Sequence, residues 1–65
     1  MQIPPKITLE AARINAGFSQ RSAAHALGIS LATYQNYESG KTSPSWHLVK
    51  KIEELFCYPI DFIRL

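Results

Sequence analysis

Residues 19 to 41 read SQRSAAHALGISLATYQNYESGK, and this stretch decides the fold. Ser19 is a favourable N-cap for a helix of about two turns. Gly28 then supplies the positive φ angle that a tight turn requires, and Ser30 caps a second helix that runs to about Ser39. The stretch therefore predicts two short helices joined by a tight turn.

The segments on either side predict three further helices. Good helix formers, with apolar residues at helical spacing, predict one helix over residues 7–16. The pair Ser43-Pro44, a cap followed by proline at the first helical position, predicts a longer helix that ends at Leu55 or Phe56. A last short helix is expected to start near Pro59. Because no strand pattern occurs, the chain predicts an all-α fold, a compact five-helix bundle.

The length of 65 residues corresponds to one small domain. Because Pro4 and Pro5 cannot extend a helix backwards, we expect residues 1–6 to form an N-terminal arm and residues 7–65 to form the helical domain. The formal net charge is +2. Residues 1–41 hold four basic and two acidic side chains, and the remainder holds three of each. The small basic excess therefore lies in the half that contains the paired helices.

The titratable residues form no pattern that predicts catalysis or metal binding. Cys57 is the only cysteine, and we expect it to be a small apolar core residue in a reducing compartment. His25 and His47 fall in no zinc-binding spacing and fit ordinary surface residues. We therefore expect no metal, no cofactor, no small-molecule substrate and no enzymatic activity. No run of eighteen apolar residues occurs, which predicts a cytoplasmic protein that does not enter a membrane.

Three short motifs occur in order at fixed spacings. They are Arg13-x-x-Ala16-Gly17-Phe18-Ser19-Gln20, Ala24-x-x-Leu27-Gly28-Ile29-Ser30, and Thr33-Tyr34-x-x-Tyr37-Glu38-x-Gly40-Lys41 followed by Pro44. Together they resemble the Cro and lambda-repressor type of helix-turn-helix domain, also called the XRE-like family, over about residues 8–63. The resemblance implies a lambda-repressor-like bundle that binds double-stranded DNA and inserts the helix over residues 30–39 into the major groove.

Five residues of that helix are the candidates for reading bases. The resemblance places Leu31, Ala32 and Asn36 at base-reading positions, with Thr33 and Gln35 on their flank. Leu31 and Ala32 replace the commoner polar residues and pack only on a thymine methyl group, whereas Asn36 can bond both N6 and N7 of adenine. We therefore expect a site that favours A·T pairs. The alternative is that Leu31 belongs to the core and that base reading is sparse.

The expected phosphate contacts lie on both sides of the paired helices. The resemblance implies that Gln20 donates its amide to a DNA phosphate while it braces the start of the helix over residues 30–39. The other candidates are small polar or basic residues, namely Ser19, Arg21, Lys41, Thr42 and Ser43. Contacts of this kind set affinity and register without reading the sequence. The alternative for each of them is an ordinary solvated side chain.

Four further residues have a structural interpretation. In the family that the chain resembles, the positions of Arg13 and Glu38 form an ion pair that ties the first helix to the end of the base-reading helix. We therefore assign neither residue to DNA contact. Tyr34 and Tyr37 lie on the helix face opposite the candidate base readers, and we expect both to point into the core.

The helix after Ser43-Pro44 carries two apolar stripes. The stripe expected to face the core consists of Trp46, Val49, Ile52 and Phe56. The second stripe, with its continuation beyond the helix, consists of Leu48, Leu55, Phe62 and Leu65. An exposed apolar patch marks an interface, so the second stripe predicts a homodimer and a palindromic operator. The alternative is a larger core that takes up this stripe.

Glu53 interrupts the same helix at a position where the family commonly has a buried alanine. Two explanations stay open, a pairing with Lys50 and a different rotation of the helix.

The sequence as a whole predicts a sequence-specific DNA-binding transcription regulator, expected to be a repressor in a bacterium, a phage or a mobile element. The alternative is a protein-interaction module that keeps the fold without specific DNA binding, favoured by the low net charge and the apolar Leu31-Ala32 pair. A third interpretation is the DNA-binding fragment of a longer regulator.

Overall fold

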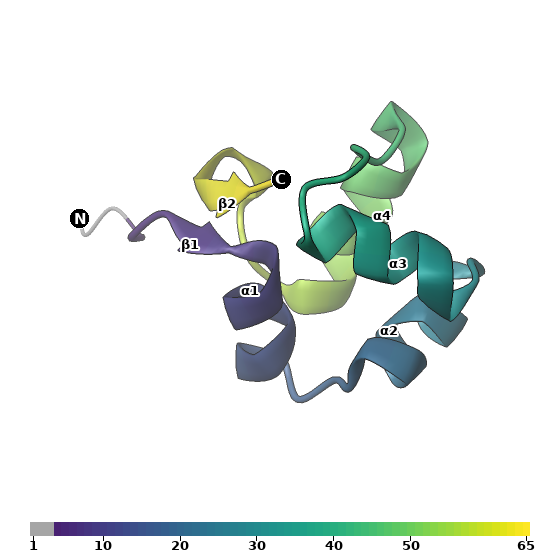
Figure 1. Cartoon of the computed structure of the whole chain (residues 1–65). Helices are drawn as coiled ribbons and strands as arrows, with labels where there is room; N and C mark the ends of the chain where they lie inside the picture. The colour runs from purple at the N-terminus through teal and green to yellow at the C-terminus, as the bar shows by residue number, and fades with distance from the viewer. Residues whose placement is uncertain (1–3) are drawn as a thin grey trace.

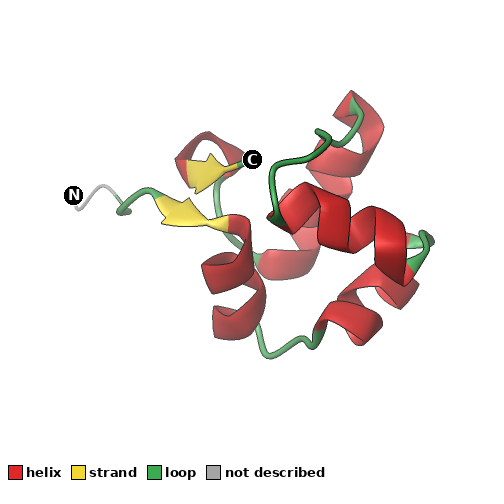
Figure 2. Cartoon of the chain, viewed as in Figure 1, coloured by secondary structure: helices red, strands yellow, loops and turns green. Residues whose placement is uncertain are grey.

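The computed structural model describes residues 4–65 (Figures 1 and 2). In chain order the elements are β1 (Ile7–Thr8), α1 (Leu9–Asn15), α2 (Gln20–Leu27), α3 (Leu31–Glu38), α4 (Trp46–Phe56), the 3-10 turn η1 (Ile60–Phe62) and β2 (Ile63–Arg64). Figure 1 shows α3 at the front with α2 below it, α4 behind α3, and α1 on the side of the chain ends. The first half of the expected arm, residues 1–3, lies outside the described residues.

Side-chain caps set where all four α-helices begin. The Thr8 hydroxyl accepts a hydrogen bond from the Ala11 N–H at 3.1 Å, so α1 starts at Leu9 and not at residue 7. Ser45 caps α4 in the same way, which places Pro44 before the cap and not at the first helical position. The expected start at Ser43-Pro44 is therefore wrong by two residues.

The core lies where the four helices meet. Its buried residues are Leu9, Ala12, Ala23, Ala24, Leu27, Tyr34, Leu48, Ile52, Phe56 and Ile63. The inward positions expected for the paired helices are confirmed, because Tyr34 is fully buried and Tyr37 packs against the core. Phe18 and Phe56 also meet here, with ring centroids 5.7 Å apart. The core therefore holds α3 against α1, α2 and α4 through its inner face only.

The chain ends form a short parallel strand pair that the sequence did not predict. Ile7 pairs with Ile63 and Thr8 with Arg64, and Ile63 is buried in the core. Within residues 4–65 the short helix expected near Pro59 is the 3-10 helix η1, so the count of five α-helices is not confirmed, and the expected absence of strands is wrong. Two residues per strand are too few to show an alternating pattern, and the pairing depends on contacts between opposite ends of the chain.

Val49, Ile52 and Phe56 of α4 are buried as predicted, but the inward face differs from the expected one at the start of the helix. Trp46, predicted to face the core, is 68% exposed, and its ring lies 5.6 Å from the Lys50 ammonium. Leu48, predicted for the exposed stripe, is only 8% exposed and joins the same core as Ala23. The inward face follows Leu48 and Ile52 at four-residue spacing, so the alternative of a larger core holds for Leu48. The prediction that Leu48 lies on an exposed interface is wrong.

The other members of that stripe are distributed between core and surface. Leu55 packs against the core from a partly buried position, Phe62 is half-buried, and Leu65 is 43% exposed. Only Leu65 therefore presents a large apolar surface to solvent. The apolar patch expected from the sequence is smaller than predicted.

Glu53 and Cys57 have roles at the end of α4. The Glu53 Oε2 accepts a hydrogen bond from the Ile60 N–H at 2.9 Å, so its carboxylate anchors η1. This contact differs from the pairing with Lys50, which was one of the two explanations left open. Cys57 ends α4 with a φ angle of 53° and is exposed, which corrects the expectation of a core residue. A helix-ending residue in the left-handed region turns the chain outward. The Tyr58 hydroxyl then donates to the Pro5 carbonyl and ties the two chain ends together.

Candidate nucleic-acid interface

The turn between α2 and α3 fixes the angle at which α3 is presented. Ser19 and Ser22 form a reciprocal capping box at the start of α2, with hydrogen bonds of 3.0 and 2.9 Å. Gly28 ends the helix with a φ angle of 73°, and the Ile29 N–H reaches back to the Ala24 carbonyl at 3.0 Å. Because Ile29 also packs against the core, the corner between the two helices is held from both sides.

A second cap begins α3. The Ser30 Oγ accepts from the Thr33 N–H at 3.1 Å and donates to the Thr33 Oγ1 at 2.8 Å. This cap explains why α3 starts at Leu31. It also engages the Thr33 hydroxyl within the protein, which makes this residue a weaker candidate for reading a base.

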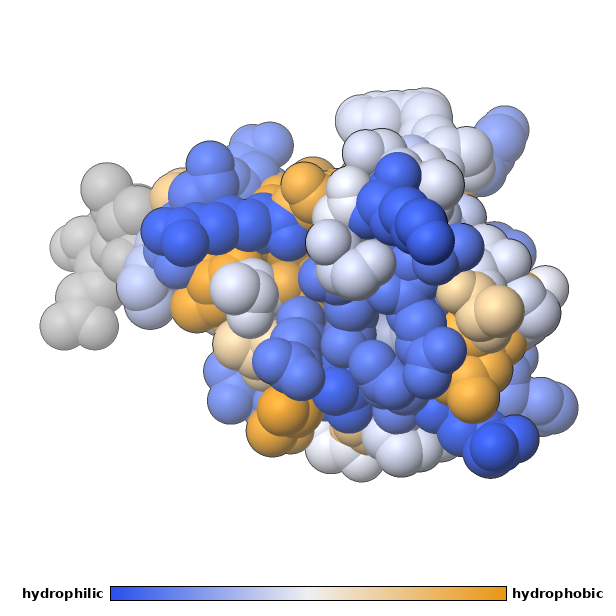
Figure 3. All heavy atoms as spheres, in the orientation of Figure 1, coloured by the Kyte–Doolittle hydropathy of each residue, from blue (hydrophilic) through white to orange (hydrophobic). Residues whose placement is uncertain are grey.

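The outer face of α3 carries the candidate base readers. Ala32 and Gln35 are exposed, while Leu31, Thr33 and Asn36 are half-buried. Leu31 does not belong to the core cluster, so the alternative that assigned it to the core is wrong. Figure 3 shows a largely hydrophilic surface over α3, with apolar patches at its margins. Ala32 and Gln35 are therefore fully open to a ligand, and the other three candidates are partly accessible.

The loop after α3 folds back onto the end of the helix. The Asn36 carbonyl accepts hydrogen bonds from the backbone N–H groups of Lys41 and Thr42, at 2.9 and 3.3 Å. Gly40 permits this path with a φ angle of 80°. As a result Lys41, Thr42 and Ser43 are exposed directly beside the C-terminal end of α3.

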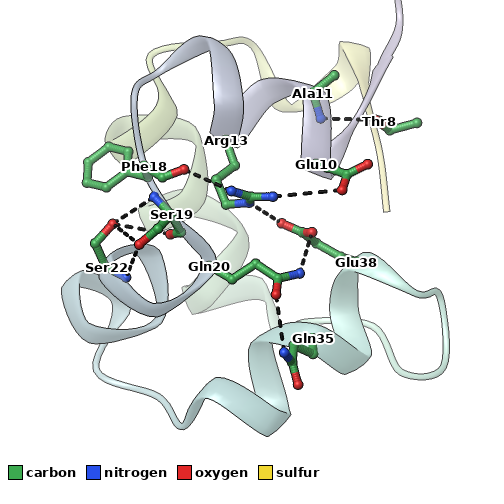
Figure 4. A network of polar contacts seen from close by, with 10 residues as sticks. All are labelled: Thr8, Glu10, Ala11, Arg13, Phe18, Ser19, Gln20, Ser22, Gln35 and Glu38. Carbon is green, nitrogen blue, oxygen red and sulfur yellow. Dashed lines mark hydrogen bonds and ion pairs between the residues drawn. The ribbon is translucent and has the colours of Figure 1, made fainter.

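A buried ion pair anchors the end of α3 to α1, as the family resemblance implied (Figure 4). The Arg13 Nε donates to the Glu38 Oε2 at 2.7 Å, and the side chains are only 10% and 7% exposed. Arg13 also donates to the Phe18 carbonyl at 2.9 Å and lies 3.8 Å from the Glu10 carboxylate. The guanidinium thus links α1, the α1–α2 connection and α3.

The environment of this pair favours both charges. Burial alone would raise the pKa of Glu38, but the neighbouring Tyr34 hydroxyl, Arg13 guanidinium and Gln20 amide outweigh it, and the pKa is lowered. Burial alone would lower the pKa of Arg13, but Glu38 outweighs it, and that pKa is raised. Burial, reinforced by the Glu38 carboxylate, raises the pKa of Tyr34. Its hydroxyl is enclosed beside the pair without a hydrogen bond of regular geometry.

Gln20 braces α3 at a different place from the one expected. Its Nε2 donates to the Glu38 Oε1 at 3.0 Å, and its Oε1 accepts from the Gln35 Nε2 at 3.2 Å (Figure 4). Both partners lie in the second half of α3 and not at its start. The sequence did not predict the contact between Gln20 and Gln35, because residues 15 positions apart on different helices leave no spacing signal. The bond to Glu38 takes one of the two hydrogens of the Gln20 amide, the group that the resemblance assigned to a phosphate.

The remaining phosphate candidates surround the start of α2 and the end of α3. Ser19 and Arg21 are exposed at the start of α2, where they line a shallow hollow together with Ser22 and His25. The Ser19 hydroxyl is already engaged by the capping box. The two basic candidates, Arg21 at the start of α2 and Lys41 after α3, are both exposed.

Comparison with known proteins agrees with this geometry. A model of the helix-turn-helix family matches residues 9–63, which span all four α-helices and the first residue of β2. No match was found among curated proteins or among solved structures. In the described part of the chain, none of the helices is both long and apolar enough to cross a bilayer.

Proposed function

Because the chain belongs to the Cro/lambda-repressor type, or XRE-like, helix-turn-helix family of DNA-binding domains, we propose that it is a sequence-specific transcription regulator. In this proposal α3 enters the major groove of double-stranded DNA and the protein represses transcription at its site. The observation that carries the proposal is the outer face of α3, which is open and hydrophilic, while the C-terminal end of the helix is fixed by the buried Arg13–Glu38 pair. A rigidly held helix presents its side chains to base edges at a defined depth.

Base reading is assigned to the side chains of the outer face. Asn36 offers the donor and acceptor that adenine N7 and N6 require, and Leu31 and Ala32 offer methyl contacts to thymine. Gln35 is the most exposed polar group of the set and supplies a further amide, whereas Thr33 is engaged in the cap. This composition supports a half-site rich in A·T pairs.

Phosphate contact is assigned to groups on both flanks of α3. Arg21 at the start of α2 and Lys41 after α3 carry the charges, and Thr42 and Ser43 offer exposed hydroxyl groups. Ser19 stays in the set, although the capping box engages its hydroxyl. Gln20 retains one amide hydrogen beyond the one that Glu38 accepts. Binding through such contacts weakens steeply as salt increases.

A homodimer on a palindromic operator completes the proposal. The exposed apolar surface that supports a dimer is smaller than the sequence indicated. Leu48 is buried, and Leu65 is the member of the apolar stripe with a large exposed surface. Two copies related by a two-fold axis would place their α3 helices about one helical turn of DNA apart. The proposal is of a binding domain and includes no enzymatic activity.

Selection of binding sites from random duplex DNA tests the function. We expect the protein to enrich a palindrome with half-sites about one helical turn, roughly 34 Å, apart. The double variant Asn36→Ala/Lys41→Ala should lose this enrichment while its circular dichroism spectrum keeps its helical signal. A matched control, Asn15→Ala/Lys51→Ala, removes the same groups from exposed positions on α1 and α4 and should select the same site.

The same experiment separates the alternative function, a protein-interaction module. The exposed Trp46 and Leu65 are the features that favour it. Weak binding that disappears with added salt and enriches no sequence would reject specific regulation, because only backbone contacts behave in this way. Loss of enrichment in both double variants alike would instead reject the assignment of Asn36 and Lys41 as contacts.

A further inference from the structure

Two glutamine amides connect the buried ion pair to the outer face of α3. Starting from the inside, the Arg13 Nε donates to the Glu38 Oε2, and the Gln20 Nε2 donates to the Glu38 Oε1. The Gln20 Oε1 then accepts from the Gln35 Nε2 at 3.2 Å. Figure 4 shows the three bonds in sequence, leading from Arg13 to the exposed side chain of Gln35. We call this series of hydrogen bonds the amide relay.

The direction of every hydrogen bond in the relay is determined by its buried end. An ionised carboxylate only accepts hydrogen bonds, and the lowered pKa of Glu38 keeps it ionised at neutral pH. Gln20 must therefore turn its NH2 group toward Glu38 and its oxygen toward α3. Gln35 in turn must direct its NH2 group inward, because only a donor can meet the Gln20 oxygen. The Gln35 oxygen is left pointing away from the relay.

We propose that Gln35 is a base-specificity residue, and that the amide relay presents its carbonyl oxygen to the major groove as a hydrogen-bond acceptor. Ala32, Gln35 and Asn36 lie three and four residues apart, so Gln35 shares the face that carries the other base readers. An outward acceptor bonds the exocyclic amine of adenine or cytosine and meets only acceptors on guanine or on the oxygen of thymine. Gln35 therefore selects amine-bearing bases at one position of the half-site, and Gln20 is its positioning residue. This inference rests on the proposed function.

The relay makes an unusual prediction for Glu38→Gln. Arg13 still needs an acceptor, so the new amide keeps its oxygen on the guanidinium and turns its NH2 group toward Gln20. Gln20 must then reverse, and Gln35 must reverse after it, which brings the Gln35 NH2 group outward. The preferred bases at the facing position should change from adenine or cytosine to guanine or thymine. A residue that only stabilises the fold would not exchange one base preference for another.

The test measures binding to a set of selected operators that carry each of the four bases at every position of one half-site. The wild-type protein should discriminate amine-bearing bases by about fivefold at one position, which is the effect of about one hydrogen bond. Gln35→Ala and Gln20→Met should both reduce this ratio to near one at that position only, and Glu38→Gln should invert it. Gln20→Met retains the length of the side chain and the Arg13–Glu38 pair, so it remains informative if Glu38→Gln is unstable. Asn15→Ala is the matched control and should leave the ratio unchanged.

A second measurement needs no DNA. In the free protein, the side-chain NH2 protons of Gln35 should exchange more slowly with solvent than in Gln20→Met, as observed by nuclear magnetic resonance. Equal exchange in the two proteins would overturn the relay. If the wild-type protein selects an operator but Gln35→Ala weakens every sequence equally, the inference is wrong while the proposed function stands. If no operator is selected at all, both are wrong.

Discussion

The guanidinium of Arg13 and the carboxylate of Glu38 meet at 2.7 Å although 25 positions separate them in the chain. Both side chains are about nine-tenths buried, and the Glu38 carboxylate also accepts from Gln20. One ion pair thus connects α1, α2 and α3 at the point where α3 ends. The stability of the domain and the orientation of its outer face therefore depend on the same two charges.

Removing one partner of this pair should destabilise the protein strongly. Glu38→Ala leaves the Arg13 charge buried and unpaired, and we expect the free energy of unfolding to fall by about 3–5 kcal/mol. Urea denaturation followed by circular dichroism measures this change. Glu54→Ala, at an exposed position of α4, is the control and should change stability by no more than about 0.5 kcal/mol. A loss below about 1 kcal/mol for Glu38→Ala would mean that the pair is solvated.

The lowered pKa of Glu38 gives stability a defined pH dependence. Because the folded state binds this proton more weakly than the unfolded chain, the carboxylate stabilises the fold above its ordinary pKa of 4.5. The contribution is lost as pH falls through the lower pKa of the folded state. Urea midpoints measured from neutral pH down to about pH 3 should therefore decrease below pH 4.5, and less steeply in Glu38→Gln. Parallel curves for the two proteins would contradict this assignment.

The paired helices follow from the sequence because their signals are local. Ser19 and Ser30 cap the two helices, and Gly28 has the positive φ angle that the turn requires. Each of these residues acts on neighbours within four positions, so a single sequence contains the information. The Arg13–Glu38 pair became predictable only through the family resemblance, since nothing local connects α1 to the end of α3.

Several of the incorrect predictions concern contacts between distant segments. The pairing of Ile7 with Ile63 joins opposite ends of the chain, and strands of two residues carry no periodicity. Whether Trp46 or Leu48 faces inward at the start of α4 depends on which side chains the rest of the core can accept, and helical spacing favoured the stripe that includes Trp46. In the site, the bond between Gln20 and Gln35 depends on the packing angle of α2 against α3. Helical spacing alone does not contain that angle.

The different burial of two neighbouring apolar residues on α4 predicts different losses of stability when each is replaced by alanine. Leu48→Ala removes a buried side chain and should cost about 2–5 kcal/mol of stability. Trp46→Ala removes a larger side chain that is 68% exposed, and it should cost at most about 1 kcal/mol, mainly the contact with Lys50. Thermal or urea denaturation of both variants measures the difference. If Trp46→Ala lost more stability than Leu48→Ala, Trp46 and not Leu48 would face the core, as the sequence predicted.

The salt dependence of binding should identify the phosphate contacts. If Lys41 neutralises one phosphate, Lys41→Ala should reduce the slope of log K against log salt concentration by about 0.9 and should weaken all duplexes alike. Lys51→Ala removes the same charge from an exposed position on α4 and should leave the slope unchanged. Fluorescence titration at several salt concentrations measures both. Equal slopes for Lys41→Ala and the wild-type protein would remove Lys41 from the contact set.

Dimerisation should depend on Leu65 if the proposed two-fold arrangement uses the apolar C-terminal end. Leu65 is 43% exposed, so Leu65→Glu places a charge on the surface without disturbing the core. Within a dimer interface, that charge would be desolvated without a partner, and the dimer dissociation constant should rise about tenfold or more. Sedimentation equilibrium over a range of concentrations measures this constant.

Ile14→Glu provides the matched control, because Ile14 is a 59% exposed apolar residue on α1. It makes the same chemical change outside the proposed interface, and the dissociation constant should stay the same. If both variants weaken the dimer equally, the effect comes from net charge and not from a contact at Leu65. If the wild-type protein stays monomeric at every concentration and also on its operator, the proposed homodimer is wrong. The selected operator should then be a single half-site and not a palindrome, because one copy of α3 occupies one segment of the major groove.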